Sequence, residues 1–242
     1  MKINILYLYY DILNLYGESG NIKALKYYFE SLGIDTHIKF TTLNEEINLK
    51  NIDLIYLGMG SENNQLLVLK HLKKYKKEIE KYILNYGFVL STGNSFELFG
   101  KTLDKEKGLG IFDYKSKREE YRIVDEALYK TDLVSKYILG FTNRNSVLIS
   151  NENSMFEVIK GVGNTPNEIK EGFTKYNFYG TYLVGPILIR NPEFLRYFCN
   201  KIIKKKDSKF KIKKVNLKLE ENAYQEFMKN YYSDIKWLKV IF

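Results

Sequence analysis

The chain of 242 residues carries 38 lysines and arginines against 29 aspartates and glutamates, which gives a formal charge of +9. Its single cysteine and two histidines exclude an internal disulfide and a cysteine-rich zinc site, and we expect no metal and no cofactor. Nothing in this composition indicates an oxidising compartment, so a cytoplasmic location is predicted. With 45% hydrophobic and 28% charged residues, the chain is typical of a globular protein.

The first hundred residues predict an α/β fold with a mostly parallel sheet flanked by helices, because apolar runs alternate with segments of helical periodicity. The apolar stretch 3–9 is too short to span a bilayer and is predicted as the first strand. A helix is predicted after Ser19 that ends at Gly33, and a longer helix after residue 61 that ends at Gly87. Further strands are predicted at 36–40, 54–57 and 88–91.

The second half of the chain is predicted to be rich in strands, and its short apolar runs are 108–114, 121–124, 137–141, 156–159 and 179–183. Asn191 followed by Pro192 predicts a helix start with an asparagine cap and a first-turn proline. We expect one α/β domain over 1–204. The region 205–242 is expected to hold a lysine-rich connector and an amphipathic segment with Tyr224, Phe227, Met228 and Tyr231 on its apolar face.

Much of the positive charge lies in one short segment near the C-terminus. Between Lys204 and Lys218 there are eight lysines, with Asp207 as the only acidic residue. No helix-turn-helix, zinc-finger or aromatic RNA-binding pattern accompanies them, so no specific nucleic-acid binding is expected. The run is interpreted as a solvated connector that could also contact an anionic membrane surface.

Three turns follow predicted strands and are candidates for chemistry. Residues 90–100 read LSTGNSFELFG, the pattern of a strand that breaks into a short helix at a nucleophile elbow. Residues 58–61 read GMGS, and residues 180–188 read GTYLVGPIL. The backbone N–H groups of Gly58 and Gly60 could face an anion or an oxyanion, with a plain tight turn as the alternative.

These segments resemble the glutaminase subunits of lipid II isoglutaminyl synthases, which are cobyric acid synthase-like (CobB/CobQ) class I glutamine amidotransferases. Residues 11–22, DILNLYGESGNI, are similar to the family's D-x-L-N-L-Y-x-x-x-G-N-I opening. The GMGS turn is similar to G-G-G-S, residues 108–111 to G-L-G-I, and residues 180–188 to G-T-Y-L-H-G-P-I-L. The resemblance implies a class I glutamine amidotransferase-like, flavodoxin-like fold and a Mur-ligase-like ATP-dependent partner.

The sequence departs from the family at both positions that the family uses for catalysis, the cysteine and the histidine. The resemblance implies a cysteine thiolate on the elbow that attacks glutamine and a histidine that relays protons. The family's elbow, C-G-G-Y-Q-x-L-G, puts Gly93 at the cysteine position, or Thr92 if Ser95 is an insertion. The family's histidine position is Val184. No competent catalytic residue is therefore expected.

Other polar residues offer no replacement by sequence alone. His37 and His71 have no motif partner, and Cys199 lies on the apolar face of its helix, so all three are interpreted as structural. The family places an arginine against the glutamine carboxylate, and Arg122 is the nearest match, with a salt-bridged arginine as the alternative. Arg122, Gly58 and Gly60 are thus the candidate substrate-binding residues. The family's E-N-H stretch is replaced by residues 142–144, TNR.

Three hypotheses for function follow. The first is a catalytically degenerate amidotransferase-like subunit that docks on a Mur-ligase-like partner and serves peptidoglycan biosynthesis. The second is an amino-acid-binding module that uses the former pocket without turnover. The third is an active glutaminase with hydroxyl chemistry at Thr92 or Ser95, which lacks a visible general base in the sequence.

Overall fold

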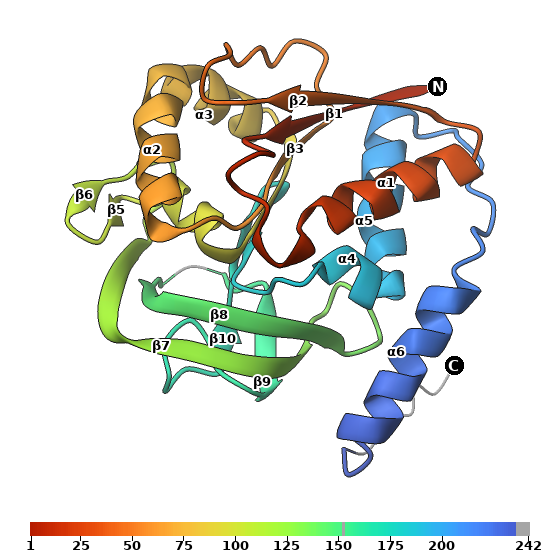
Figure 1. The fold of residues 1–242 in the computed structure, drawn as a ribbon. Helices are drawn as coiled ribbons and strands as arrows, with labels where there is room; N and C mark the ends of the chain where they lie inside the picture. Colours follow the sequence, from red (N-terminus) through yellow and green to blue (C-terminus); the bar gives the residue numbers. More distant parts are fainter. Residues whose placement is uncertain (152, 236–242) are drawn as a thin grey trace.

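The computed structural model describes residues 1–151 and 153–235, and within them a six-stranded sheet forms the centre of the molecule (Figure 1). The strand order is β11-β12-β4-β3-β1-β2, in which β11 is antiparallel to β12 and the other neighbours are parallel. The strands span Lys2–Leu8 (β1), Asp35–Thr41 (β2), Leu54–Leu57 (β3), Phe88–Thr92 (β4), Phe173–Lys175 (β11) and Phe178–Thr181 (β12). The predicted α/β class is confirmed.

Helices cover both faces of this sheet, as Figure 1 shows. One face packs on α1 and α5 and the other on α2 and α3, so alternate residues of β1 enter two different hydrophobic cores. The helices span Ser19–Ser31 (α1), Glu62–Leu72 (α2), Lys76–Leu84 (α3), Ile187–Arg190 (α4), Pro192–Lys206 (α5) and Lys218–Tyr231 (α6). None of the helices in 1–151 and 153–235 has the length and apolar character that a membrane span requires.

The second half of the chain adds a second sheet built on the long antiparallel pair β7 and β8 (Figure 1). Its strands span Thr102–Leu103 (β5), Glu106–Lys107 (β6), Lys115–Lys130 (β7), Ile138–Ile149 (β8), Phe156–Lys160 (β9) and Lys170–Glu171 (β10). The prediction of a strand at 108–114 is wrong. The N–H groups of Leu109, Gly110 and Ile111 donate to carbonyls of residues 98–100, so this run lies against the turn after β4 as a loop.

The long helix predicted after β3 is interrupted. A 3₁₀ turn at Lys73–Tyr75 separates α2 from α3, because Tyr75 leaves the helical conformation (φ −111°, ψ 15°) and its ring packs edge-on against His71. The helix ends at Leu84, and Tyr86, not Gly87, adopts the left-handed conformation that follows it. Two further 3₁₀ segments span Leu15–Gly17 and Gly93–Phe99.

The C-terminal part begins with α5, which starts with Pro192 in its first turn as predicted. The Asn191 side chain does not cap this helix, because it bonds the backbone of Leu139 and Ile187 instead. The predicted apolar face is buried at Leu195, Phe198, Cys199, Ile202 and Ile203. The division at residue 204 stays a prediction, and residues 236–242 of the predicted second region lie outside the described residues.

The amphipathic segment predicted near the C-terminus forms α6, which buries Tyr224 and Met228 against β7 and β8. The lysine run is not wholly solvated. Lys204 donates to backbone carbonyls of residues 208 and 210, Lys205 to those of residues 85 and 86, and Lys206 pairs with Asp53 at 2.8 Å. These three lysines anchor the end of α5, Lys206 through an ion pair and Lys204 and Lys205 through hydrogen bonds to backbone carbonyls.

We predict that Cys199 does not react with a thiol reagent in the folded protein. Its side chain has no exposed surface, and burial raises the pKa of its thiol well above the usual value. Titration with 5,5′-dithiobis(2-nitrobenzoic acid) should show no release of thionitrobenzoate in buffer and one equivalent in denaturant. Rapid stoichiometric reaction of the native protein would contradict this assignment.

Candidate functional site

Three strand ends bring the predicted turns to one edge of the central sheet. In the order β12-β4-β3, Thr181 lies opposite Thr92, and Ser91 lies opposite Leu57. The chain leaves these parallel strands toward Val184, Gly93 and the GMGS turn at 58–61. Ligand sites of open α/β sheets form at this carboxyl edge.

The segments that resemble the amidotransferase family also contact one another here. Leu15 N–H donates to Met59 O at 3.0 Å, which ties the opening segment to the GMGS turn. Leu188 N–H donates to Asn21 Oδ1 at 2.9 Å, which ties the opening segment to the loop after β12. The fold therefore assembles motifs that lie more than 150 residues apart in the sequence into one site.

Gly93 occupies the elbow after β4 with φ +63°, in the left-handed region that glycine adopts at no steric cost. A Cβ atom at this position would lie 2.6 Å from Met59 Cγ and 2.9 Å from its Sδ. Met59, which is 4% exposed, therefore fills the space that any side chain on the elbow would need. Met59 belongs to the GMGS turn, where the family resemblance has glycine.

Val184 is buried and makes a backbone contact. Its N–H donates to Phe141 O at 2.9 Å, which joins the loop after β12 to β8. A valine side chain neither accepts nor donates a proton. The position therefore supports packing at the site and no acid–base chemistry.

The glycines of the GMGS turn permit close packing by the opening segment. A Cβ on Gly58 would lie 2.8 Å from Glu18 Cβ, and one on Gly60 would lie 2.8 Å from Ile12 O. Gly60 also bonds the Asn94 side chain twice, through its N–H at 3.3 Å and its carbonyl at 2.9 Å. This geometry supports the tight-turn alternative, because the Gly60 N–H already has a partner within the protein.

A buried polar cluster below the elbow was missed by sequence reasoning. Glu18 Oε2 accepts hydrogen bonds from Thr92 Oγ1 and, at 2.5 Å, from the Tyr56 hydroxyl, which in turn accepts one from Asn21 Nδ2 at 2.8 Å. Burial raises the pKa of Glu18 to about 7, although these hydrogen bonds act to lower it. The expectation that Thr92 lacks a nearby base is therefore wrong. Glu18 lies at a variable position of the opening motif, so the sequence carried no signal for it.

A second buried cluster surrounds Arg144, which is 3% exposed. Its guanidinium donates to the carbonyls of Gly163, Asn164 and Ser146 and stacks 3.7 Å from the centre of the Tyr182 ring. Ser146 Oγ in turn donates to Glu97, which also accepts from Gln65 Nε2 at 2.9 Å. The cluster links the 3₁₀ segment Gly93–Phe99 to β8, and the Arg144 side chain has a structural role in it.

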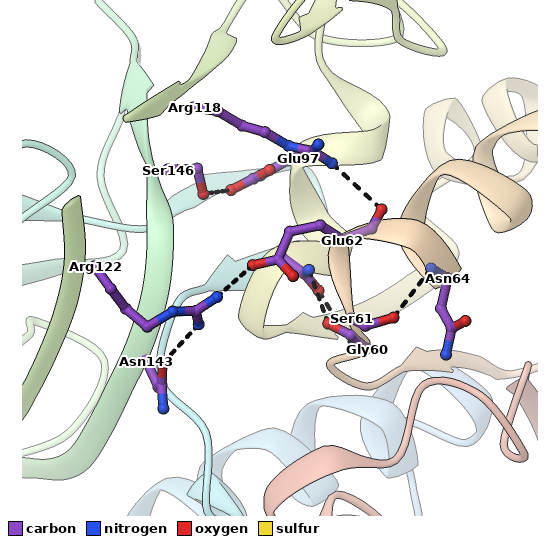
Figure 2. Close-up of polar contacts among 10 residues, drawn as sticks. Gly60, Ser61, Glu62, Asn64, Glu97, Arg118, Arg122, Asn143 and Ser146 are labelled. Carbon is purple, nitrogen blue, oxygen red and sulfur yellow. Dashed lines mark hydrogen bonds and ion pairs between the residues drawn. The ribbon is translucent and has the colours of Figure 1, made fainter. Parts of the chain in front are cut away.

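Arg122 lies on β7 beside the GMGS turn, and Figure 2 shows its side chain pointing toward Glu62. Its NH2 donates to Glu62 Oε1 at 2.7 Å and its NH1 to Asn143 Oδ1 at 2.8 Å (Figure 2). Glu62 is the first residue of α2 and follows Ser61 directly. The structure thus has Arg122 in the salt-bridged arrangement, while its role in binding substrate stays a prediction.

The two histidines lie away from the elbow. His37 is on the edge strand β2, and His71 lies in α2, where its Nδ1 hydrogen-bonds the Tyr9 hydroxyl at 2.9 Å. Burial, with a contribution from Lys74, lowers the pKa of His71. The contact of His71 agrees with the structural role predicted for it, while the role of His37 stays a prediction.

The architecture and the elbow define an α/β protein of the glutamine amidotransferase fold class. The chain is similar in fold to a crystal structure of a glutamine amidotransferase from Thermotoga maritima, with a TM-score of 0.51 and 12% identity over 94% of this chain and 92% of that one. Residues 4–192 match the CobB/CobQ-like glutamine amidotransferase domain, and the chain belongs to this family.

Two relatives share most of its length. It is 27% identical to the lipid II isoglutaminyl synthase (glutamine-hydrolyzing) subunit GatD of Streptococcus pneumoniae, over 97% of this chain and 92% of the relative. It is 29% identical to the subunit of the same name from Staphylococcus aureus, over 93% of this chain and 94% of the relative. The resemblance found in the sequence motifs is confirmed.

We predict that Gly93→Ala destabilises the protein by about 2–4 kcal/mol, because overpacking against Met59 adds to the cost of a left-handed non-glycine residue. Met59→Gly should relieve the clash, so a double-mutant cycle should give a favourable coupling of about 1–3 kcal/mol. Met59→Ala is the matched control, since it retains the Cβ that faces residue 93. Additive effects in urea unfolding for the Gly93→Ala/Met59→Gly pair would contradict this packing.

We also predict that stability falls as pH rises from about 5 to 8. Glu18 has a folded-state pKa of about 7 and an ordinary value of 4.5, so the folded protein binds more protons in this window. Its contribution is fully present below the ordinary pKa and is lost as pH rises through the folded pKa. Burial raises the pKa of Glu171 to about 7 as well, so it contributes with the same sign.

The Glu18→Gln variant distinguishes the contribution of Glu18 to this pH dependence from that of Glu171. It should reduce the loss of unfolding free energy between pH 5 and pH 8 by up to about 3 kcal/mol, because the amide does not ionise. Urea unfolding at four pH values in this range measures the effect. Equal pH slopes for the variant and the parent protein would contradict the assignment.

Proposed function

We propose that this chain is a catalytically degenerate glutamine amidotransferase-like subunit that docks on a Mur-ligase-like ATP-dependent partner in the cytoplasm. The partner would amidate a peptidoglycan precursor. The names of two relatives, each a subunit of a glutamine-hydrolysing lipid II isoglutaminyl synthase, support the pathway and the presence of a partner. The observation that carries the loss of catalysis is the Met59 side chain packed in the space above Gly93.

Hydrolysis of glutamine by this family's chemistry needs a nucleophile, a base and donors for the oxyanion. Gly93 has no side chain, and Val184 cannot accept a proton. The Gly60 N–H is engaged by Asn94. On this proposal Arg122 holds Glu62 in place of the carboxylate of a glutamine substrate.

Hydroxyl chemistry at Thr92 has one supporting feature, the hydrogen bond to Glu18. Thr92 and Glu18 both have 0% exposed surface, so an amide substrate does not reach the hydroxyl in this structure. Ser95 is also fully buried, and it bonds Ser91 Oγ at 2.7 Å. The degenerate subunit is therefore the better supported function.

The amino-acid-binding alternative requires an open space beside the elbow. Met59, Gly93 and Val184 are all buried, and Met59 fills the space that loss of a larger elbow residue would leave. A bound glutamine would have to displace the Met59 side chain. Thermal-shift measurements with glutamine and glutamate should accordingly show no stabilisation.

We predict that the purified chain releases no glutamate from glutamine above the level of the buffer. Its complex with a co-purified Mur-ligase-like subunit should amidate the lipid-linked precursor with ammonium chloride and not with glutamine as nitrogen source. Incorporation from ¹⁵N-amide glutamine or from ¹⁵N-ammonium, followed by mass spectrometry, distinguishes the two sources.

The Thr92→Ala variant is the control for hydroxyl chemistry. Glutamate release by the parent protein that disappears in Thr92→Ala would overturn the proposal in favour of an active enzyme. Glutamine-dependent amidation that persists in this variant would overturn it as well. Failure to capture any ligase-type subunit would overturn the docking role.

A further inference from the structure

A cavity lies on the flank of the central sheet, away from the elbow. It has a volume of about 310 Å³ and lies between strands β1 and β2 and the segment that precedes β3. Three of its lining residues are lysines, Lys2, Lys39 and Lys50, and His37 adds an imidazole. No aspartate or glutamate lines this cavity, which we call the basic pocket.

The strand register explains why these side chains share one surface. β1 and β2 are parallel and pair Asn4 with His37 and Leu6 with Lys39, so side chains of matched residues point to the same side of the sheet. Lys50 lies in the segment 48–52. This segment is held to β1 by a hydrogen bond that Asn4 Nδ2 donates to Asn51 O at 2.8 Å. The pairing of β1 with β2 and the Asn4–Asn51 hydrogen bond thus bring the positive side chains together.

The charges of the basic pocket are not neutralised within the fold. Among the ion pairs of residues 1–151 and 153–235, none involves Lys2, Lys39 or Lys50. The nearby carboxylate of Asp53 accepts from the Asn4 N–H and from Lys206, both at 2.8 Å. A concave surface of one charge sign focuses its field and raises the local concentration of counter-ions.

The pocket also offers neutral hydrogen-bond donors. Asn48 Oδ1 accepts the Lys50 N–H at 2.9 Å, which fixes the amide and leaves its Nδ2 as a donor. Lysine ammonium groups are compact point charges with three donors each, and they are common ligands of phosphate oxygens in proteins. A phosphate group occupies only part of 310 Å³, so the group to which it is attached also has room.

We propose that the basic pocket binds a phosphate group, carried by a soluble phosphate compound or by the headgroup of an anionic phospholipid. This site is separate from the proposed amidotransferase-like role. It lies beside Asn51 and Ile52, which precede β3, whereas the GMGS turn follows the other end of that strand. Binding here therefore does not depend on glutamine chemistry or on a partner subunit.

The test compares two double variants of equal charge in the full chain. Lys39→Gln/Lys50→Gln removes two ammonium groups from the basic pocket, and Lys211→Gln/Lys213→Gln removes two exposed ones from the lysine run. One arm titrates inorganic phosphate and pyrophosphate by calorimetry at constant ionic strength. The other arm measures co-sedimentation with phosphatidylcholine vesicles that contain or lack phosphatidylglycerol.

The expected result is that the pocket variant weakens binding by at least about tenfold while the lysine-run variant binds like the parent chain. This result in the soluble arm assigns the site to a soluble phosphate compound, and in the vesicle arm to a lipid headgroup. Equal weakening in both double variants would overturn the proposal, because a general basic surface would explain it. Absence of binding in both arms would overturn it as well.

Discussion

The packing of Met59 against the backbone of Gly93 is the contact on which the character of the candidate site depends. Parallel strands β3 and β4 end side by side, so the turn after each must share the same small volume. In this chain one turn supplies a bulky side chain and the other supplies none. Gly93 adopts the left-handed backbone conformation at the elbow, while the Met59 side chain fills the space that a side chain at position 93 would need.

The polar groups around the elbow are buried and hydrogen-bonded to one another or to the backbone. Glu18 accepts hydrogen bonds from Thr92 and Tyr56, and Arg144 donates to backbone carbonyls. A buried carboxyl or guanidinium group requires such partners, because loss of hydration is costly. The neutral form that burial favours for Glu18 suits a carboxyl group that joins the opening segment to the elbow.

The excess positive charge divides into two kinds of lysine. At the end of α5, Lys206 is paired with Asp53, and Lys204 and Lys205 donate to backbone carbonyls. The lysines of the basic pocket converge without a carboxylate in the lining. A lysine that is already ion-paired within the fold gains less binding free energy from an anionic ligand. Lysines that lie close together without ion pairs attract an anion more strongly.

The α/β class, the central strands, the apolar face of α5 and the family were all predictable from the sequence, since periodicity and local motifs are properties of neighbouring residues. The family resemblance also predicted that Gly93 or Thr92 stands at the cysteine position and Val184 at the histidine position. Three contacts became visible in the folded chain alone: Met59 fills the elbow, Glu18 bonds Thr92, and Arg122 pairs with Glu62. These contacts join residues 34, 74 and 60 positions apart, and no local pattern specifies which distant side chains will meet.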